Sequence, residues 1–379
     1  MAKTASQTAS PSADKIGAID LGYGLVKAKF GDHEFLFPSV AIPADESTLR
    51  QAHGTAARNT VDVPVKLGGN TTRSYEVGPD ILMAQTGADY GRHPGAEFAN
   101  SPIYHALMLG ALRYMETDHL DMLVLGLPVS GFLSAERVQS LMNDWRGEHD
   151  LGVDENGVPR KIVIDQVFVH AQPFGGYLNA ISHRMEALKT AINASGSGLK
   201  VESQQDLVSL TILVVDPGAY TLDWMVLQPG GHISSKASGA ADDTGRDRLI
   251  RAVFERLQKD IGRSLGANTV HRLNNALQDL ESPSILLQGK RVGLAPYIPI
   301  MRAEVSDSVA QMISRLKGAE DEVNLVIVVG GHPQLYAEEV QKRFPDMPVF
   351  YGNQSVFDVV RGYEVLGKLM LDSERAEAA

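Results

Sequence analysis

The chain has 379 residues, a mass of 41.0 kDa and a formal net charge of −11. Because domains commonly run to about 100–200 residues, this length predicts at least two lobes. Hydrophobic residues make up 44% and charged residues 21%, which is typical of a globular protein and excludes a wholly disordered one. The acidic balance argues against a general nucleic-acid coat, since wrapping phosphates requires clustered cations.

Three absences in the sequence narrow the class of protein further. No apolar run approaches the roughly 18 residues that span a bilayer, and residues 1–15 lack the apolar stretch of a secretory signal. The sequence contains no cysteine, which excludes disulfides, thiolate metal sites and thiol catalysis. We therefore expect a soluble, cytoplasmic protein without a membrane partner.

The first lobe is expected at residues 15–205, after a flexible tail at 1–14 that is rich in Ala, Ser, Thr and Gln. Residues 16–20 predict a strand that breaks at Gly22-Tyr23-Gly24 and resumes at 25–30, which is a hairpin with a glycine turn. A third strand is expected at 34–37. The polar, Gly-rich stretch of about 45–100 contains another hairpin, at 61–67 and 71–77, and predicts a small inserted subdomain.

The rest of the first lobe alternates between helices and strands. The apolar spacing predicts helices over 101–116, over 135–146 with Ser134 as the N-cap, and from Pro173 to about 192. Strands are expected at 122–127 and 161–169, with a turn-rich loop at 151–160. The run Ala194-Ser195-Gly196-Ser197-Gly198 and the polar residues after it predict the boundary between the lobes near 205.

The second lobe, expected at 206–362, begins with the same pattern as the first. A strand at 210–215 leads into a Gly-containing turn at 216–221 and a second strand at 222–227, so an aspartate again follows an apolar run. Two such units indicate a duplicated architecture. Helices are expected over 244–265, 301–317, 333–343 and 356–371, with a strand at 323–329 before Gly330-Gly331. Residues 363–379 are expected to return to the first lobe and to end in a polar tail.

The two Gly-rich turns are the strongest chemical signal. Glycines let successive backbone amides approach an anion, which makes a phosphate cradle. Asp20 and Asp216 would hold Mg²⁺ through water, and Lys27 could neutralise a phosphate. Most Asp-x-Gly turns are only turns, so one alone is a weak signal. Two in equivalent positions favour phosphate binding.

Two further elements could complete a nucleotide site. The backbone at Gly330-Gly331 could pass close to a base or sugar, although an ordinary strand-to-helix turn has the same pattern. Gln172, at a strand end before a helix, could orient a water but cannot act as a strong base. Alternatively, Gln172 is an ordinary loop residue whose side-chain amide forms hydrogen bonds with nearby groups. The histidines show no metal-ligand spacing, so no zinc site is expected.

Together, these four elements in this order resemble the actin-like ATPases, and among them the ParM-type plasmid-segregation proteins. The match covers roughly residues 15–371, and the segments nearest to the ParM type are Leu125-Gly126-Leu127-Pro128-Val129 and residues 353–362. The resemblance implies an α/β, actin-like (ribonuclease H-like) duplicated two-lobe fold with ATP and Mg²⁺ in a central nucleotide cleft. It also implies ATP hydrolysis to ADP, assembly into filaments, and plasmid or DNA segregation through a DNA-binding adaptor protein. No direct sequence-specific DNA binding is expected.

The resemblance also assigns residues by position. It implies catalytic roles for Asp20, Gln172 and Asp216, with Mg²⁺ held by Asp20 and Asp216 through water. The implied phosphate-binding residues are Gly22, Tyr23, Gly24, Lys27, Gly218, Ala219, Tyr220 and Thr221. Those implied near the base and ribose are Gly245, Arg246, Arg248, Gly330, Gly331 and His332.

Several departures from the family pattern affect the expected rate of hydrolysis. Tyr23 is bulky where small polar residues are common, and Pro217 removes a backbone donor beside Asp216. Gln172 stands where ParM-like proteins often carry glutamate, and His332 replaces a frequent glycine. Hydrolysis could therefore be slow.

Three alternative functions share this fold. A small-molecule kinase would need a catalytic aspartate facing a sugar pocket, for which the sequence offers no convincing candidate. A chaperone-type ATPase is disfavoured because the chain ends at Ala379, soon after the last connecting helix. A weakly hydrolysing nucleotide-binding scaffold remains open, given Gln172 and Pro217.

Overall fold

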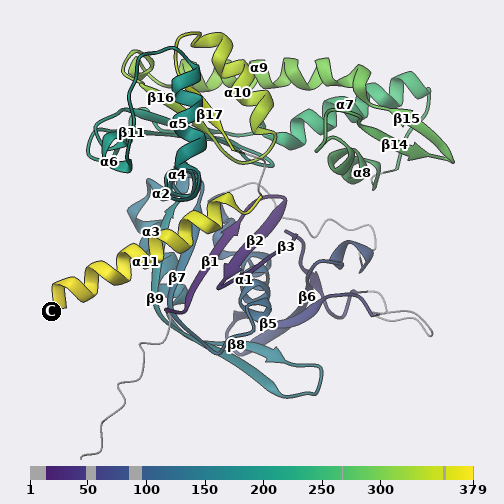
Figure 1. The fold of residues 1–379 in the computed structure, drawn as a ribbon. Helices are drawn as coiled ribbons and strands as arrows, with labels where there is room; N and C mark the ends of the chain where they lie inside the picture. Colours follow the sequence, from purple (N-terminus) through teal and green to yellow (C-terminus); the bar gives the residue numbers. More distant parts are fainter. Residues whose placement is uncertain (1–13, 48–56, 85–95, 267, 353–355, 379) are drawn as a thin grey trace, which may run out of the picture.

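The structure, a computed structural model, describes residues 14–47, 57–84, 96–266, 268–352 and 356–378. Two β-sheets form the centres of two lobes, which lie one above the other in Figure 1. Apart from Asp14, the expected tail at 1–14 lies outside the described residues, and so do parts of the expected insertion at 45–100. None of the described helices combines the length and apolar character that crossing a bilayer needs.

The sheet of the first lobe has six strands in the order β3-β2-β1-β7-β9-β8. Its strands are β1 (Ile16–Leu21), β2 (Leu25–Phe30), β3 (His33–Pro38), β7 (His119–Leu127), β8 (Gly147–Val153) and β9 (Pro159–Ala171). The first three form an antiparallel meander, whereas β1, β7 and β9 run parallel. Because parallel strands end at the same sheet edge, Asp20 lies beside the ends of β7 and β9.

The predicted loop at 151–160 is wrong. Residues up to Val153 belong to β8, which pairs antiparallel with β9. The turn is short because the Asp154 carboxylate accepts hydrogen bonds from the amides of Asn156 and Val158, both at 2.9 Å. The turn-forming residues therefore close a hairpin instead of extending a loop.

Three helices accompany the first sheet: α1 (Pro102–Tyr114), α2 (Val129–Phe132) and α3 (Ala135–Trp145). The Ser101 hydroxyl accepts a hydrogen bond from the Tyr104 amide at 3.1 Å, which starts α1. The predicted start of α3 is confirmed, but Ser134 makes no side-chain capping bond, so the capping role predicted for its side chain is wrong.

A small three-stranded sheet in the order β4-β6-β5 is inserted in the first lobe. Its strands are β4 (Ile42–Pro43), β5 (Val61–Gly68) and β6 (Thr71–Val77), followed by short 3₁₀ turns η1 (Ile81–Ala84) and η2 (Ala96–Asn100). The predicted hairpin is thereby confirmed. Glu76 is 1% exposed and accepts from Arg58 at 3.1 Å, so this small sheet has an ion pair at its base.

The second sheet repeats the first, with the order β12-β11-β10-β16-β17 and β13 paired to β11. Its strands are β10 (Ile212–Pro217), β11 (Leu222–Gln228), β12 (His232–Ile233), β13 (Gly239–Ala241), β16 (Leu325–Val328) and β17 (Val349–Tyr351). As in the first sheet, a hairpin (β10 and β11) is followed by parallel strands (β10, β16 and β17). The duplication predicted from the two strand–turn–strand units is confirmed.

The remaining elements surround the second sheet. The helices are α5 (Met185–Ala194), α6 (Gln204–Leu207), α7 (Arg246–Ile261), α8 (Asn268–Ala276), α9 (Ile298–Ser314) and α10 (Pro333–Arg343). A hairpin of β14 (Ser284–Leu287) and β15 (Lys290–Gly293) lies next to α8 at one side of the lobe, and the 3₁₀ turns are η3 (Ala295–Tyr297) and η4 (Ala319–Asp321). Neither α8 nor this hairpin was expected from the sequence, because both are short and weakly periodic.

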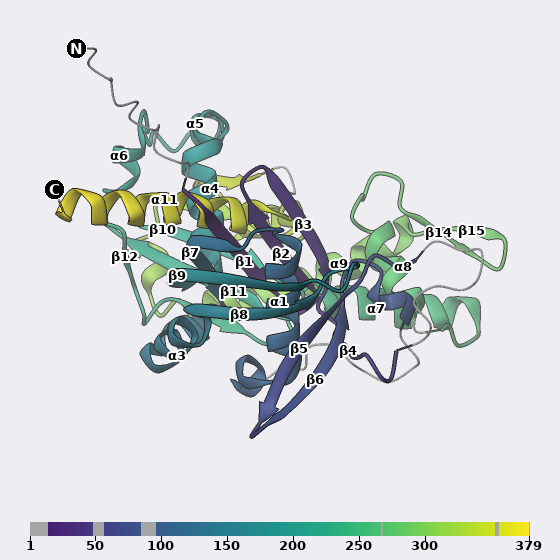
Figure 2. The same cartoon turned by 90° about the horizontal axis from the view of Figure 1, so that it is seen from below.

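Two helices, α4 (Gln172–His183) and α11 (Asp358–Ala378), run between the lobes and pack on each other (Figures 1 and 2). Their backbones approach so closely that a Cβ on Gly362 would overlap the Gly175 carbonyl oxygen. The single helix predicted at 173–192 is wrong, because Arg184 leaves helical geometry (φ −131°, ψ 22°) and separates α4 from α5. Helix α5 then packs on β17 of the second sheet.

Each lobe has its own apolar core, and a third core joins them. The third core includes Ile16 and Val124 from the first sheet, Val214 and Ile327 from the second, and Tyr363 from α11. The lobes are therefore connected by continuous packing as well as by the chain.

Candidate functional site

The two aspartate-bearing turns meet at one cavity between the lobes. Residues from both lobes and from α4 and α11 line it: Asp20, Gly22, Tyr23, Gly24, Leu25, Lys27, Gln172, Asp216, Pro217, Gly218, Ala219, Thr221, Arg246, Gln278, Gly330, Gly331, His332, Val356, Asp358 and Val359. Its volume is about 80 Å³. Pockets for drug-sized ligands measure about 300–1,000 Å³, so a nucleotide would require the two turns to move apart.

The first turn is fixed by backbone bonds and by β3. The Gly22 amide donates to the Leu25 carbonyl at 3.0 Å, which closes the turn. Ser39 follows β3 and holds the turn twice: its amide donates to the Gly24 carbonyl at 3.1 Å and its hydroxyl to the Gly22 carbonyl at 2.7 Å. The glycine turn predicted from the sequence is therefore present and is held by three hydrogen bonds.

Asp20 is 2% exposed and has two partners at the floor of this turn. Lys27, its neighbour across the β1–β2 ladder, donates from Nζ to Oδ2 at 2.7 Å. Gln172, the first residue of α4, donates from Nε2 to Oδ1 at 2.6 Å. Within the described part of the chain no donor contacts the amide oxygen of Gln172, which can therefore accept a hydrogen bond from a water.

The second turn is held by the start of α7. The amides of Gly245, Arg246 and Asp247 donate to the carbonyls of Tyr220, Gly218 and Ala219 at 3.0, 3.0 and 2.8 Å. The positive end of this helix therefore lies behind the turn. Among the described residues, no protein group accepts from the amides of Ala219 and Tyr220, so both are available to an anion.

Asp216 differs from Asp20 in its surroundings. It is 8% exposed, and within the described part of the chain its carboxylate accepts no hydrogen bond from protein. Burial raises its pKa to about 7, and the nearby Asp20 and Asp223 carboxylates act in the same direction, while Lys27 opposes them. Gly330 (φ 72°) makes this burial possible, because a Cβ there would overlap the Asp216 carboxylate.

A divalent cation fits this pair of aspartates. The donors are hard oxygens, and the Asp216 carboxylate is a buried group without a compensating partner, which a cation would satisfy. A separate group of His119, Asp121 and Asp165, away from the turns, has ligand atoms within 4.8 Å of one another. There, His119 Nε2 and Asp165 Oδ2 lie 3.0 Å apart, so the imidazole and this carboxylate already have each other as hydrogen-bond partners.

The segment 330–332 lies against the second turn. The Gly331 amide donates to the Pro217 carbonyl at 2.8 Å, which fixes this close approach. His332 (φ 48°) is 2% exposed, and its Nε2 is 2.9 Å from the Leu277 carbonyl oxygen. Burial lowers the pKa of His332, so a neutral ring lines the cavity.

Three residues expected at the site do not line this cavity. Arg248 points to α9, where Nε is 2.5 Å from Glu304 Oε2. Tyr220 packs against Tyr23, with ring centroids 5.2 Å apart and the rings tilted by 48°. Gly245 has a structural role, because a Cβ there would lie 2.7 Å from the Ala219 carbonyl oxygen.

Sequence reasoning missed several residues that the structure brings to the site. Gln278, Val356, Asp358 and Val359 line the cavity. Asp223 joins the lobes, because it accepts from the Thr221 hydroxyl at 2.6 Å and from the Val129 amide, at the start of α2, at 2.9 Å. The sequence could have indicated Asp223, because it lies opposite Asp216 in the predicted β10–β11 hairpin. No sequence pattern indicated Gln278.

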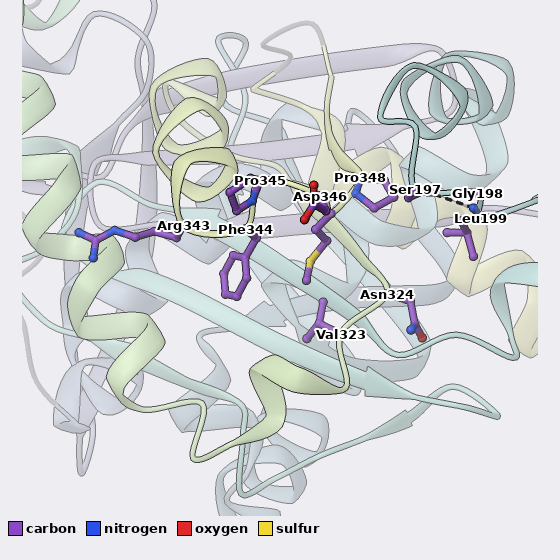
Figure 3. Close-up of a pocket in the computed structure, with 11 residues that line it drawn as sticks. Ser197, Gly198, Leu199, Val323, Asn324, Arg343, Phe344, Pro345, Asp346 and Pro348 are labelled. Carbon is purple, nitrogen blue, oxygen red and sulfur yellow. Dashed lines mark hydrogen bonds between the residues drawn. The ribbon is translucent and has the colours of Figure 1, made fainter.

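A second, larger cavity of about 620 Å³ lies on the second lobe, away from the turns (Figure 3). The loop 197–199, residues 323–324 before β16 and residues 343–348 after α10 line it. Arg343, its cationic residue, is paired with Glu339 at 3.3 Å. This cavity therefore lacks the convergent charges of the inter-lobe site.

Known proteins share this two-lobe architecture. Residues 18–175 match the family model of the actin like proteins N terminal domain. No curated protein matches the sequence. Among solved structures, the archaeal actin homolog Ta0583 is 18% identical with a TM-score of 0.67, over 93% of this chain and 99% of that one. The pCBH ParM non-polymerisable quadruple mutant is also 18% identical with a TM-score of 0.67, over 94% and 100%.

The actin-like protein Alp7A is 14% identical with a TM-score of 0.68, over 96% of this chain and 99% of that one. These likenesses extend across both lobes, whereas the family model covers only the first. The resemblance seen in the sequence is confirmed: the chain has the two-lobe actin-like fold, and its residues 18–175 match the N-terminal domain of the actin-like proteins.

Proposed function

We propose that the chain is an actin-like ATPase that binds and hydrolyses ATP with Mg²⁺ between its lobes and assembles into nucleotide-dependent filaments. The observation that carries this proposal is that Asp20 and Asp216, on equivalent turns of two duplicated lobes, line the same cavity. Solved neighbours support it: Ta0583 has been seen in complex with ADP, Bacillus thuringiensis ParM with AMPPNP, and ParM from Clostridium botulinum as a 15-stranded filament.

The residue roles follow from chemistry at each position. The glycine turns at Gly22, Gly24 and Gly218, with Lys27, would hold the phosphates, and Gly330 and Gly331 would lie beside the adenosine. Asp20 and Asp216 would hold Mg²⁺ through water, and the ion when bound would neutralise charge on the phosphates.

Gln172 would orient the attacking water. Its Nε2 donates a hydrogen bond to Asp20 at 2.6 Å, which holds the side chain in one orientation. Its oxygen would then accept a hydrogen bond from the attacking water. An amide cannot take a proton from water at neutral pH, so Gln172 would position the water without acting as a base. This is consistent with slow hydrolysis.

Nucleotide binding would require the lobes to open and then to close. In the structure the turns touch through Tyr23 and Tyr220, and the cavity between them is about 80 Å³. A ligand that contacts both turns stabilises the arrangement of the lobes that fits it best. The relative position of the lobes would therefore depend on which nucleotide is bound. Loss of the terminal phosphate would then weaken contacts between subunits.

Along the chain, the proposed lobes are 15–205 and 206–362, with 363–379 returning to the first lobe. Near the boundary, α5 packs on β17 of the second sheet. The proposed partners are other copies of the same chain and a DNA-binding adaptor protein, in plasmid or DNA segregation in the cytoplasm. The net charge of −11 and the pairing of Arg248, Arg251 and Arg256 with carboxylates disfavour direct DNA binding.

Assembly and hydrolysis test the proposal directly. Purified protein with Mg²⁺ and ATP should scatter light and pellet, and electron microscopy with a slowly hydrolysed ATP analogue should show filaments. Asp216→Ala should nearly abolish hydrolysis. Absence of polymer at high protein concentration with either ATP or GTP would reject the filament function. Phosphate transfer to a metabolite would favour a kinase, and failure of single-turnover hydrolysis would favour a nucleotide-binding scaffold.

A further inference from the structure

Arg246 is a buried cation without a close acceptor in the described part of the chain. It is the first residue of α7, and its side chain is 14% exposed. Its Nε is buried and makes no hydrogen bond. Among the described residues, the one carboxylate within 4 Å of its guanidinium belongs to Asp247, its own neighbour in sequence, at 3.9 Å. Burial lowers the pKa of Arg246, whereas the Asp247 side chain is 49% exposed, so this long contact with a solvated carboxylate compensates the guanidinium weakly.

The other arginines of α7 are different. Arg248 contacts Glu304 at 2.5 Å, Arg256 contacts Asp260 at 2.9 Å, and Arg251 contacts Asp243 at 3.4 Å. In the cavity, Lys27 is neutralised by Asp20 at 2.7 Å. Arg246 is thus the cavity-lining cation that has no strong partner among the described residues.

The guanidinium lies where the two turns meet. A Cβ placed on Gly24 of the first turn would be 3.2 Å from Arg246 Nη2 and 3.1 Å from the Cβ of Ala219 in the second turn. Arg246 therefore extends from the second lobe to the first-lobe phosphate turn.

A buried guanidinium needs an anion. Leaving a largely buried charge unpaired is unfavourable, and a planar fork of donors matches phosphate oxygens in shape as well as in charge. The free amides of Ala219 and Tyr220 on the adjacent turn offer further donors to the same kind of ligand.

We propose that Arg246 binds the terminal phosphate of a nucleoside triphosphate, joining α7 of the second lobe to the first-lobe turn, and so discriminates triphosphate from diphosphate. This inference rests on the proposed function, because it assigns a specificity residue within the same cleft. Through Arg246, the presence of the γ-phosphate would then influence the relative position of the lobes.

Nucleotide affinity of Arg246→Gln tests this assignment, with Arg251→Gln as the matched control on the same helix. Arg251 is half exposed and lies outside the cavity. With Mg²⁺ present, Arg246→Gln should weaken a slowly hydrolysed ATP analogue by about 10- to 100-fold, the range expected for a lost charged hydrogen bond. Affinity for ADP should change less than threefold. Arg251→Gln should bind both ligands like the unmodified protein.

Arg246→Lys separates charge from folding. It keeps the positive charge without the guanidinium fork, so it should recover part of the lost affinity for the ATP analogue while its circular dichroism and melting temperature stay near those of the unmodified protein. Equal loss of ATP-analogue and ADP affinity, or no loss in Arg246→Gln, would overturn the assignment while leaving the ATPase proposal intact. If the unmodified protein bound neither nucleotide, the proposed function itself would fail, and the inference with it.

Discussion

Replacing Asp216 with asparagine should stabilise the protein, and the gain should grow with pH. The pKa of Asp216 is raised by burial to about 7, from an ordinary value of 3.8. Between these values the unfolded chain has ionised this carboxyl while the folded chain keeps its proton. The folded state therefore binds more protons, and its stability falls as pH rises through this window.

The magnitude follows from the size of the shift. Each pH unit is worth about 1.4 kcal/mol, so the burial cost at Asp216 reaches roughly 4 kcal/mol above pH 7 and stays constant beyond it. Asparagine has nearly the same shape and no charge. The free energy of unfolding of Asp216→Asn, minus that of the unmodified protein, should therefore increase by about 3 kcal/mol between pH 5 and pH 8.

Urea denaturation followed by tryptophan fluorescence can measure this difference, without Mg²⁺ or nucleotide, since a cation would favour the ionised carboxylate. Trp224 on β11 is a local reporter, because it lies opposite Val215, the residue before Asp216. Asp346→Asn, at an exposed position of the same lobe, serves as the control. A variant no more stable than the unmodified protein at pH 8, or a difference independent of pH, would refute the reasoning.

Two further predictions concern the water-positioning residue and the helix crossing. Gln172→Ala should slow phosphate release by about 10- to 100-fold and prolong filament lifetime, because the attacking water loses its orientation; unchanged kinetics and lifetime would contradict that role. Gly362→Ala should lower the free energy of unfolding in urea by about 1–3 kcal/mol, because its Cβ would overlap the Gly175 carbonyl. Helix propensity alone predicts a gain of about 1 kcal/mol, so the sign of the change decides between the two effects.

Features encoded by short segments were predictable from the sequence. Both glycine turns occur at the predicted positions, because glycine turns between apolar runs specify hairpins locally. The β14–β15 hairpin was missed because its strands have four residues each and no buried face long enough to show a period. The break between α4 and α5 was missed for a related reason: Arg184 is an ordinary helix former, and its conformation is not specified by its own sequence.

Arg246 and Arg248 show why the membership of the site was harder to predict than its location. The resemblance assigned both to the base and ribose, but residues two apart on a helix point about 200° away from each other. Which of them faces the cavity depends on where α7 begins, and it begins at Arg246 because the amides of its first turn bond to the carbonyls of the second phosphate turn. Because these hydrogen bonds fix the start of α7, Arg246 lines the cavity and Arg248 contacts Glu304.

The charge state of Asp216 likewise arises from tertiary contacts. It depends on Gly330 covering the carboxylate and on three charged neighbours from both lobes, none of which is adjacent in sequence. Burial makes the ionised Asp216 carboxylate unfavourable, and it also makes this carboxylate a strong ligand for a cation. A nearby positive charge compensates for the lost hydration and lowers the pKa of Asp216. We therefore expect Mg²⁺–nucleotide binding near pH 7 to release a proton and to stabilise the fold less than at pH 8, where almost no proton has to leave. Calorimetry in buffers of different ionisation enthalpy would measure that proton directly.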